Sequence, residues 1–248
     1  MSLLKLFLLA LSFYTRLPCP PITDYQHLPP AAVFLPLVGW LGGAITAASF
    51  YLATLLWPQA TAIVIALMIG VLLTGALHED GFADVCDGFG GGFGKPRILE
   101  IMKDSHIGVY GVVGLLLIFL LKISLLNGIT AAAVPWVLLT GHSLSRLPPL
   151  LLMRRYDYAR GPAGKAAAAV YKPSLQTVML AAATALLPLA LLPALCALAI
   201  IPVLLVNRYV GHYFHRHIGG YTGDCLGASQ QIAETVFYLS VSALWTFI

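Results

Sequence analysis

The sequence has few charged residues. Only 10% of its 248 residues are Asp, Glu, Lys or Arg, whereas 59% are hydrophobic and the mean hydropathy is +0.88. A soluble domain carries about 25% charged residues, so this scarcity excludes an ordinary soluble domain and predicts a polytopic membrane protein. Apolar segments run through the whole chain. We therefore expect a single all-α integral-membrane domain over residues 1–248.

Cysteine is sparse, and no cleavage site for a signal peptide follows the N-terminal apolar run. The cysteines show no C-x-x-C spacing and are too few for a disulfide framework, so we interpret them as isolated thiols: they are Cys19, Cys86, Cys196 and Cys225. The N-terminal run contains Lys5, and prolines rather than small residues follow it. This pattern favours a retained helix lying at the membrane interface.

Seven segments are long and apolar enough to cross about 30 Å of hydrocarbon. They are residues 33–57, 61–77, 107–126, 131–153, 174–192, 194–213 and 231–248. Lys5 and Arg16 precede the first span, and nine further basic residues lie in the loops 78–106, 154–173 and 214–230. The short turns between spans carry none. By the positive-inside rule, the long loops and the N-terminus are cytoplasmic and the C-terminus is outside.

The loop at 78–106 concentrates the acidic residues. Six of the ten acids lie there: Glu79, Asp80, Asp84, Asp87, Glu100 and Asp104. Each helical residue advances about 100°, so Asp80, Asp84 and Asp87 lie on one narrow face. The small residues that flank this face leave room for a ligand: they are Gly81, Gly88 and Ala83. Such a stripe of like charge repels itself unless a cation compensates. Oxygen ligands suit Mg²⁺ or Mn²⁺, so the spacing predicts a divalent-metal site. The alternative is a solvated loop.

A second short helix and a glycine-rich link belong to the same loop. Glu100 and Asp104 are again four residues apart, and if this helix folds back, Asp104 can complete a two-metal carboxylate cluster. The glycines at 88–94 either present backbone N–H groups to phosphate or form a plain flexible turn.

A second polar motif lies near the C-terminus. Residues 219–224 read Gly-Gly-Tyr-Thr-Gly-Asp, directly before a predicted helix that carries Gln230, Gln231 and Glu234. A helix start of this kind could bind a phosphorylated or amide-rich ligand. The alternative is a turn with an acid near the helix N-terminus.

Three cations fall inside predicted spans. Lys122 lies near the outer end of its span, and we expect it to snorkel to the interface. Arg146 and Arg208 lie deeper, where a cation is costly and normally faces a polar cavity or an acidic partner. They either approach a substrate diphosphate or snorkel.

Several motifs together resemble the cobalamin synthase family of adenosylcobinamide-GDP ribazoletransferases. The principal motifs are HEDGFADVCDGFGG at 78–91, EIMKDSHIGVYG at 100–111 and GGYTGDCLGA at 219–228. Thr15-Arg16-Leu17-Pro18, Ser145-Arg146 and Tyr158-Ala159-Arg160 also fit the pattern. The resemblance covers residues 13–235, and the motifs occur in the family's order.

The resemblance implies a Mg²⁺-dependent enzyme of the bacterial inner membrane, with its active site facing the cytoplasm. The family joins adenosylcobinamide-GDP to α-ribazole or α-ribazole 5′-phosphate and releases GMP. Carried over by motif, the acidic helix supplies Asp80, Asp84 and Asp87, the second acid is Asp104, and the C-terminal loop supplies Gly219, Gly220, Thr222, Gly223 and Asp224. Glu79 stands at a variable position of the family and is not counted as a ligand. The acidic helix is similar to the motif of CDP-alcohol phosphotransferases but lacks their Ala-Arg pair, so their mechanism is not transferred.

The resulting hypothesis is a transfer to a ribose hydroxyl of α-ribazole, which attacks the cobinamide-side phosphorus. Metal held by Asp80, Asp84 and Asp87 would neutralise the diphosphate. Asp104 would be a fourth ligand or the general base. The expected contacts to phosphate or substrate amides are Arg146, Gly220, Thr222, Gly223 and Asp224. Membrane lipid and a homo-oligomer are further expected partners, and nucleic acid is not.

Two rival classes are weighed against this hypothesis. A membrane prenyltransferase would carry a second Asp-rich cluster late in the chain, where Asp224 stands alone. A cation transporter would place acids within its spans, whereas these acids lie at the edges of spans.

Overall fold

The computed structural model describes residues 2–20, 28–160 and 171–248. These residues form helices joined by short links and include no strand; a single parallel bridge joins Tyr158 to Tyr221. The all-α prediction is confirmed. The helices are α1 (Leu3–Tyr14), α2 (Leu28–Ala31), η2 (Ala32–Phe34), α3 (Leu35–Thr54), α4 (Gln59–Thr74), α5 (Leu77–Gly91), α6 (Lys95–Ile101), α7 (Val109–Asn127), α8 (Val134–Leu144), α9 (Leu147–Arg155), α10 (Leu175–Leu186), η4 (Leu187–Leu191), η5 (Ala194–Ala199), α11 (Ile200–Ile218) and α12 (Gly223–Trp245).

Three helical stretches in the described residues are long and apolar enough to cross a membrane. They are Ala32–Thr54, Val109–Asn127 and Ala194–Ile218. A fourth results if α4 and α5 are counted as one bent span, although the two meet at 91°. The predicted count of seven spans is therefore not confirmed.

Prolines explain two of the predicted spans that lack a continuous α-helix. The segment 131–153 is divided into α8 and α9, and Pro148 and Pro149 occupy the first turn of α9. Proline is tolerated in a first turn but interrupts a helix that arrives from before it. The segment 174–192 changes from α10 to a 3₁₀ helix beside Pro188.

A sharp bend separates the apolar helix α4 from the acidic helix α5. Gly75 and Ala76 both have left-handed backbone angles, with φ of 63° and 60°. Their N–H groups donate to Leu72 O and Val71 O at 3.2 and 2.9 Å and so satisfy carbonyls at the end of α4. Because α5 carries four carboxylates and turns away from α4, we place α5 outside the membrane-spanning segments.

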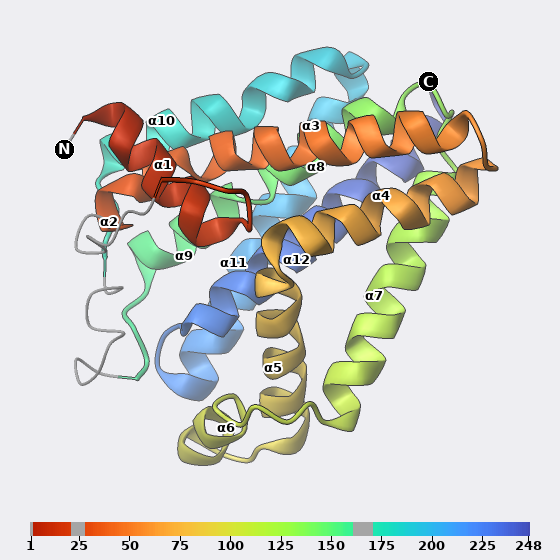
Figure 1. Ribbon diagram of the computed structural model, residues 1–248. Coiled ribbons are helices and arrows are strands. Elements are labelled where there is room, and N and C mark those ends of the chain that lie inside the picture. The colour runs from red at the N-terminus through yellow and green to blue at the C-terminus, as the bar shows by residue number, and fades with distance from the viewer. Residues whose placement is uncertain (1, 21–27, 161–170) are drawn as a thin grey trace.

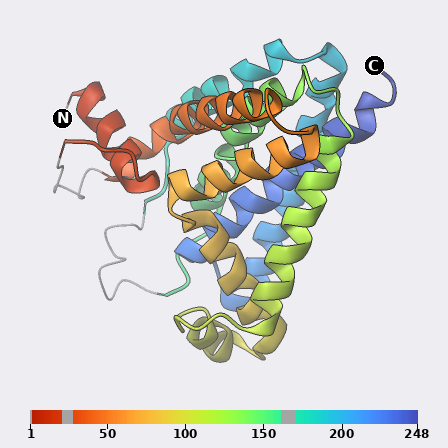
Figure 2. The ribbon, with the colours of Figure 1, turned by 45° about the vertical axis from the view of Figure 1, so that its right-hand side comes forward.

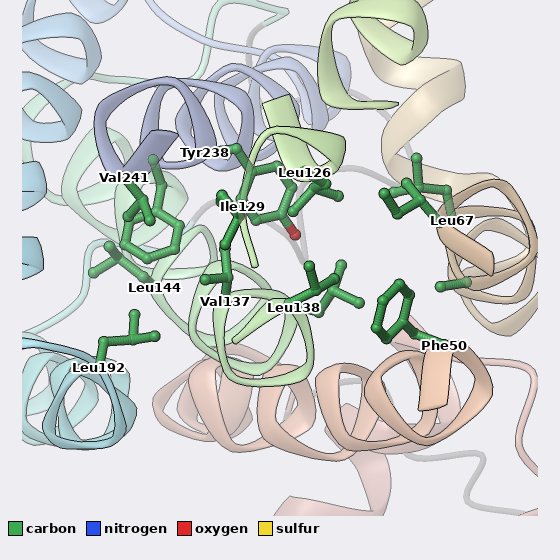
Figure 3. Packing of buried hydrophobic residues seen from close by; sticks show 14 of the residues in the cluster. Phe50, Leu67, Leu126, Ile129, Val137, Leu138, Leu144, Leu192, Tyr238 and Val241 are labelled. Atoms are coloured by element: carbon green, nitrogen blue, oxygen red, sulfur yellow. The ribbon is translucent and has the colours of Figure 1, made fainter. Parts of the chain in front are cut away.

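The apolar core lies between α3, α4, α8 and α12. Figure 3 shows Phe50 of α3, Leu67 of α4, Leu138 of α8 and Tyr238 of α12 directed toward a common centre. A second apolar cluster lies among α6, α9, α11 and α12 and contains Ile98, Leu150, Phe214, Ile218 and Cys225. The two clusters fix α12 in the middle of the molecule (Figure 1).

The acidic helix α5 packs between α7 and α12, as both ribbon views show (Figures 1 and 2). The close packing depends on glycine. A Cβ on Gly81 would lie 2.8 Å from the backbone O of Asp224, and a Cβ on Gly227 would lie 3.2 Å from His78 O. The sequence interpretation that Gly81 and Gly88 leave room for a ligand is therefore wrong. The backbone of α12 occupies the space beside Gly81, and the Met102 side chain occupies the space beside Gly88.

Candidate functional site

Asp84 on α5 lies at the centre of a group of acidic side chains. Burial raises the pKa of its carboxyl from 3.8 to about 7, and the negative charges of Asp224, Asp80 and Asp87 contribute to this rise. Three of these acids share α5, as the helical spacing predicted. The fourth, Asp224, comes from the first turn of α12. The two sequence motifs therefore meet at one place.

Arg160 is the cation of this group, although it was not among the predicted site residues. Its Nη2 atom lies 2.9 Å from Asp224 Oδ2 and also donates to Met102 O at 3.2 Å. Burial raises the pKa of Asp224, while Arg160 acts in the opposite direction. A signal was available, because Tyr158-Ala159-Arg160 fits the pattern of the family that the sequence resembles.

The first half of the Gly-Gly-Tyr-Thr-Gly-Asp motif supports the fold, and the second half belongs to the acidic site. Gly219 ends α11 with φ of 79°, and a Cβ on Gly220 would collide with the backbone O of Asp157. Tyr221 N–H donates to that oxygen at 3.0 Å. Backbone conformation thus accounts for Gly219 and packing for Gly220, and a contact of Gly220 with substrate stays a prediction.

The second half of the motif forms the start of α12. Thr222 is buried; its Oγ1 accepts from Cys225 N–H at 3.3 Å and donates to Asp224 Oδ2 at 3.1 Å. Beside Gly223 the space is open, and a methyl group added there would meet no packed neighbour within 4 Å. An open helix N-terminus favours anionic groups through its unsatisfied N–H groups.

Asp87 is turned toward α7. Its Oδ2 accepts from Gly108 N–H at 2.7 Å and its Oδ1 from Gly111 N–H at 2.9 Å. Both oxygens therefore cap the first turn of α7, where a carboxylate also interacts favourably with the helix dipole. Each oxygen keeps a further lone pair for another ligand.

Asp104 is exposed and bound to its own loop. Its Oδ1 accepts from His106 N–H at 3.0 Å and lies 2.7 Å from His106 Nδ1, and these bonds lower the pKa of Asp104. The main charge effects on its pKa come from His106 and Arg97. The structure does not bring Asp104 into the group around Asp84, so its role as a ligand or base stays a prediction.

The acidic group fits a hard divalent cation by its chemistry. Asp80, Asp84 and Asp224 offer only carboxylate oxygens, which Mg²⁺ prefers. The raised pKa of Asp84 reflects burial and excess negative charge, which a cation would relieve. In the described part of the chain, no three His, Cys, Asp or Glu side chains form a ready-made ligand set.

Lys122 does not snorkel, and that prediction is wrong. The side chain is only 2% exposed, and its Nζ atom donates to Gln231 Oε1 at 2.7 Å and to Glu234 Oε1 at 3.1 Å. Burying a charge costs several kcal/mol unless it is paired. The carboxylate of Glu234 supplies that pair inside the bundle.

Glu234 is the hub of this buried polar cluster. It accepts from Gln230 Nε2 at 2.7 Å and from Tyr238 OH at 3.1 Å. Gln231 Nε2 donates to Glu79 Oε1 at 2.9 Å, so the cluster reaches back to the acidic helix. The sequence signal for this cluster was the presence of Gln230, Gln231 and Glu234 within about one turn of an otherwise apolar helix.

Arg146 lies within the same cluster. It is 1% exposed, its Nη1 donates to His142 O, and its Nε has no partner among the described residues. With His78 and His142 it lines a cavity of about 20 Å³, enough for one water molecule. The cation beside Asp84 and Asp224 is Arg160, and contact of Arg146 with a substrate diphosphate stays a prediction.

Comparison with known proteins identifies the family. The sequence model of cobalamin-5-phosphate synthase matches residues 6–242. A relative from Shewanella amazonensis is 43% identical over 98% of this chain and 96% of its own length. Relatives from Shewanella frigidimarina and Ralstonia nicotianae are each 40% identical, over 97% and 96% of this chain and 95% and 94% of their own. All three are named adenosylcobinamide-GDP ribazoletransferase. No solved structure matches. The chain belongs to the cobalamin-5-phosphate synthase family.

Proposed function

We propose that this protein transfers the adenosylcobinamide phosphate moiety of adenosylcobinamide-GDP to α-ribazole or α-ribazole 5′-phosphate and releases GMP. The observation that carries the proposal is the meeting of Asp84 and Asp224, which come from separate family motifs, beside the open start of α12. Sequence similarity over nearly the whole chain to relatives named for this reaction supports it.

In the reaction, a ribose hydroxyl of the acceptor forms a bond to the cobinamide-side phosphorus, and the bond from that phosphorus to the GMP oxygen breaks. Arg160 would bind a phosphate oxygen through its guanidinium group. The first N–H groups of α12 would face the same diphosphate. The hydroxyl proton would pass to a carboxylate, and Asp104 stays the candidate base, provided that it turns away from His106.

The acidic residues would hold Mg²⁺. When bound, Mg²⁺ neutralises the diphosphate and the charge that develops on the departing GMP. Asp80, Asp84 and Asp224 are the primary ligands in this proposal. Asp87 would contribute the lone pairs that α7 leaves free. Asp104 would join from its loop as the alternative to its role as the base.

The proposal places the site at the cytoplasmic side of a multi-pass protein of the bacterial inner membrane. Its support is the clustering of Lys and Arg in the loops that flank the site. The nucleotide substrate is found on that side. Three or four apolar helices are consistent with several crossings.

The test compares GMP release by variants of the purified protein with adenosylcobinamide-GDP, α-ribazole and Mg²⁺. We expect Asp84→Asn and Asp224→Asn to lose at least about 1,000-fold in rate, because several kcal/mol of charge stabilisation are removed. The matched control is Asp157→Asn, an exposed acid that pairs with Lys172, which should stay within about twofold of the parent protein. Near-normal GMP release by Asp84→Asn would refute the assignment of the site.

A further inference from the structure

A large hollow lies between α9, the start of α10 and α11, and its lining includes none of the acidic-site residues. Its volume is 690 Å³, and a neighbouring hollow of 370 Å³ shares Arg155, Tyr156 and Arg208 with it. Figure 1 shows α9 and α7 on opposite sides of the α11–α12 pair. Because they share these residues, the two hollows form one site, the basic hollow.

The lining of the basic hollow is strongly positive. It contains four cations and no acidic side chain among the described residues: the cations are Arg154, Arg155, Lys172 and Arg208. Arg154 donates to Pro173 O at 2.9 Å, and Lys172 pairs with Asp157 outside the hollow at 3.3 Å. Within the described chain, Arg155 and Arg208 form no ion pair, and the Arg155 guanidinium lies 5.7 Å from the ring centre of Tyr156. Two guanidinium groups thus face the hollow without an anion.

The floor of the basic hollow continues into an apolar surface. Leu204 and Leu205 line it and are 42% and 63% exposed, and Ile201 lies one turn before them and is 56% exposed. Residues three and four apart share a helical face, so Ile201, Leu204, Leu205 and Arg208 form one stripe along α11. This stripe belongs to a helix long and apolar enough to cross a membrane.

A surface with cations at one end and an apolar stripe beside them suits an amphiphilic ligand, which has an anionic head and an apolar tail. We propose that the basic hollow binds the phosphate headgroup of an anionic phospholipid, held by Arg155 and Arg208, with an acyl chain along Leu204 and Leu205. Guanidinium groups bind phosphate oxygens in pairs, and basic pockets between membrane helices on the cytoplasmic side are suited to acidic headgroups. A soluble phosphate ester would use the arginines but not the exposed leucines.

The test measures retained lipid by native mass spectrometry of the full-length protein, released from micelles with equal amounts of phosphatidylglycerol and phosphatidylcholine. We expect the parent protein to retain phosphatidylglycerol preferentially. Arg155→Gln/Arg208→Gln should lower its retention by at least about tenfold, since each cation near a headgroup contributes about fivefold. The matched control is Arg97→Gln/Lys103→Gln, which removes the same charge outside the hollow and should retain the parent preference.

Four results would overturn the proposal. They are equal retention of the two lipids by the parent protein, unchanged retention by the double variant, an equal loss in the control, and displacement of phosphatidylglycerol by millimolar ribose 5-phosphate. The last would identify the hollow as a site for a soluble phosphate ester. If the double variant elutes as an aggregate, each single variant should show about a fivefold loss, and unchanged retention by both would equally refute the site.

Discussion

Asp84 carries the electrostatic character of the acidic site. It is surrounded by Asp80, Asp87 and Asp224, and Arg160 acts on it with the opposite sign. Residues on one helix face can be placed together by spacing alone, but Asp224 and Arg160 come from distant parts of the chain. The site therefore consists of Asp84, the acids near it on α5, and charged side chains that folding brings from other parts of the chain.

The raised pKa of Asp84 predicts how the stability of the metal-free protein depends on pH. The folded state holds the proton up to about pH 7, whereas the unfolded chain releases it near the ordinary value of 3.8. Between these values the folded state binds more protons, so its stability falls as pH rises. Asp224, whose pKa is also raised, contributes with the same sign.

Thermal unfolding in detergent with a chelator present should detect this effect. We expect the midpoint to fall from pH 5 to pH 8 in the parent protein and to fall less in Asp84→Asn. Adding Mg²⁺ at pH 8 should raise the midpoint of the parent protein more than that of the variant, because binding stabilises the folded state. Identical pH profiles for the two proteins would show that Asp84 does not carry this charge repulsion.

At the scale of the elements, Asp87 joins two helices. It lies on α5 and receives the N–H groups that begin α7. We expect Asp87→Ala to lower the free energy of unfolding by about 2–4 kcal/mol, because one buried and one partly buried N–H donor lose a charged acceptor. Chemical denaturation followed by circular dichroism measures the change. Asp104→Ala, at an exposed acid, is the control and should cost about 0.5 kcal/mol or less; equal costs would contradict the capping role.

The contact between α5 and α12 depends on Gly81. A methyl group there would meet the backbone of Asp224 at 2.8–3.0 Å, and that backbone cannot move without shifting α12. We expect Gly81→Ala to cost about 1–3 kcal/mol in stability and to slow GMP release by separating Asp84 from Asp224.

Gly91→Ala provides the matched control on the same helix. Its new methyl would meet only side-chain atoms at 3.8–3.9 Å, which is ordinary contact. Its stability should be unchanged or raised by up to about 1 kcal/mol, because alanine loses less backbone entropy than glycine. If Gly81→Ala behaves like Gly91→Ala in both measurements, the two helices are not held by this close approach.

At the scale of the whole molecule, the buried polar cluster ties four helices together. Lys122 of α7 donates to Glu234 and Gln231 of α12, and Gln231 in turn donates to Glu79 of α5. Ser145 at the end of α8 accepts from Gln230 at 2.9 Å. The cluster adjoins the acidic helix but does not share its exposed face. It fixes the position of α5 relative to the bundle.

A double-mutant cycle on Lys122 and Glu234 tests this role. Lys122→Met and Glu234→Gln should each cost about 3–5 kcal/mol, since each leaves a buried charge without its partner. The double variant should cost less than the sum by about 1–3 kcal/mol. Stability is measured by denaturation in detergent, and strictly additive costs would mean that the pair does not interact in the folded protein.

The sequence by itself determined that the chain is apolar and helical, and that Asp80, Asp84 and Asp87 lie on one face of a helix. These depend on local rules, because helix periodicity fixes the angle between residues a few positions apart. The motif before α12 was likewise identified as a helix start, and the structure adds that Thr222 is its cap. The family motifs supplied the reaction.

Only the tertiary structure decided which residues contact each face of a helix. Lys122 and Glu234 are 112 positions apart, and depth along a predicted span could not show that Lys122 points inward at a carboxylate. Gly81 and Gly88 were interpreted as space for a ligand, because spacing does not reveal that α12 lies against Gly81 and Met102 against Gly88. Asp224 and Arg160 join Asp84 for the same reason: long-range packing, rather than local geometry, sets which charged groups share one low-dielectric space.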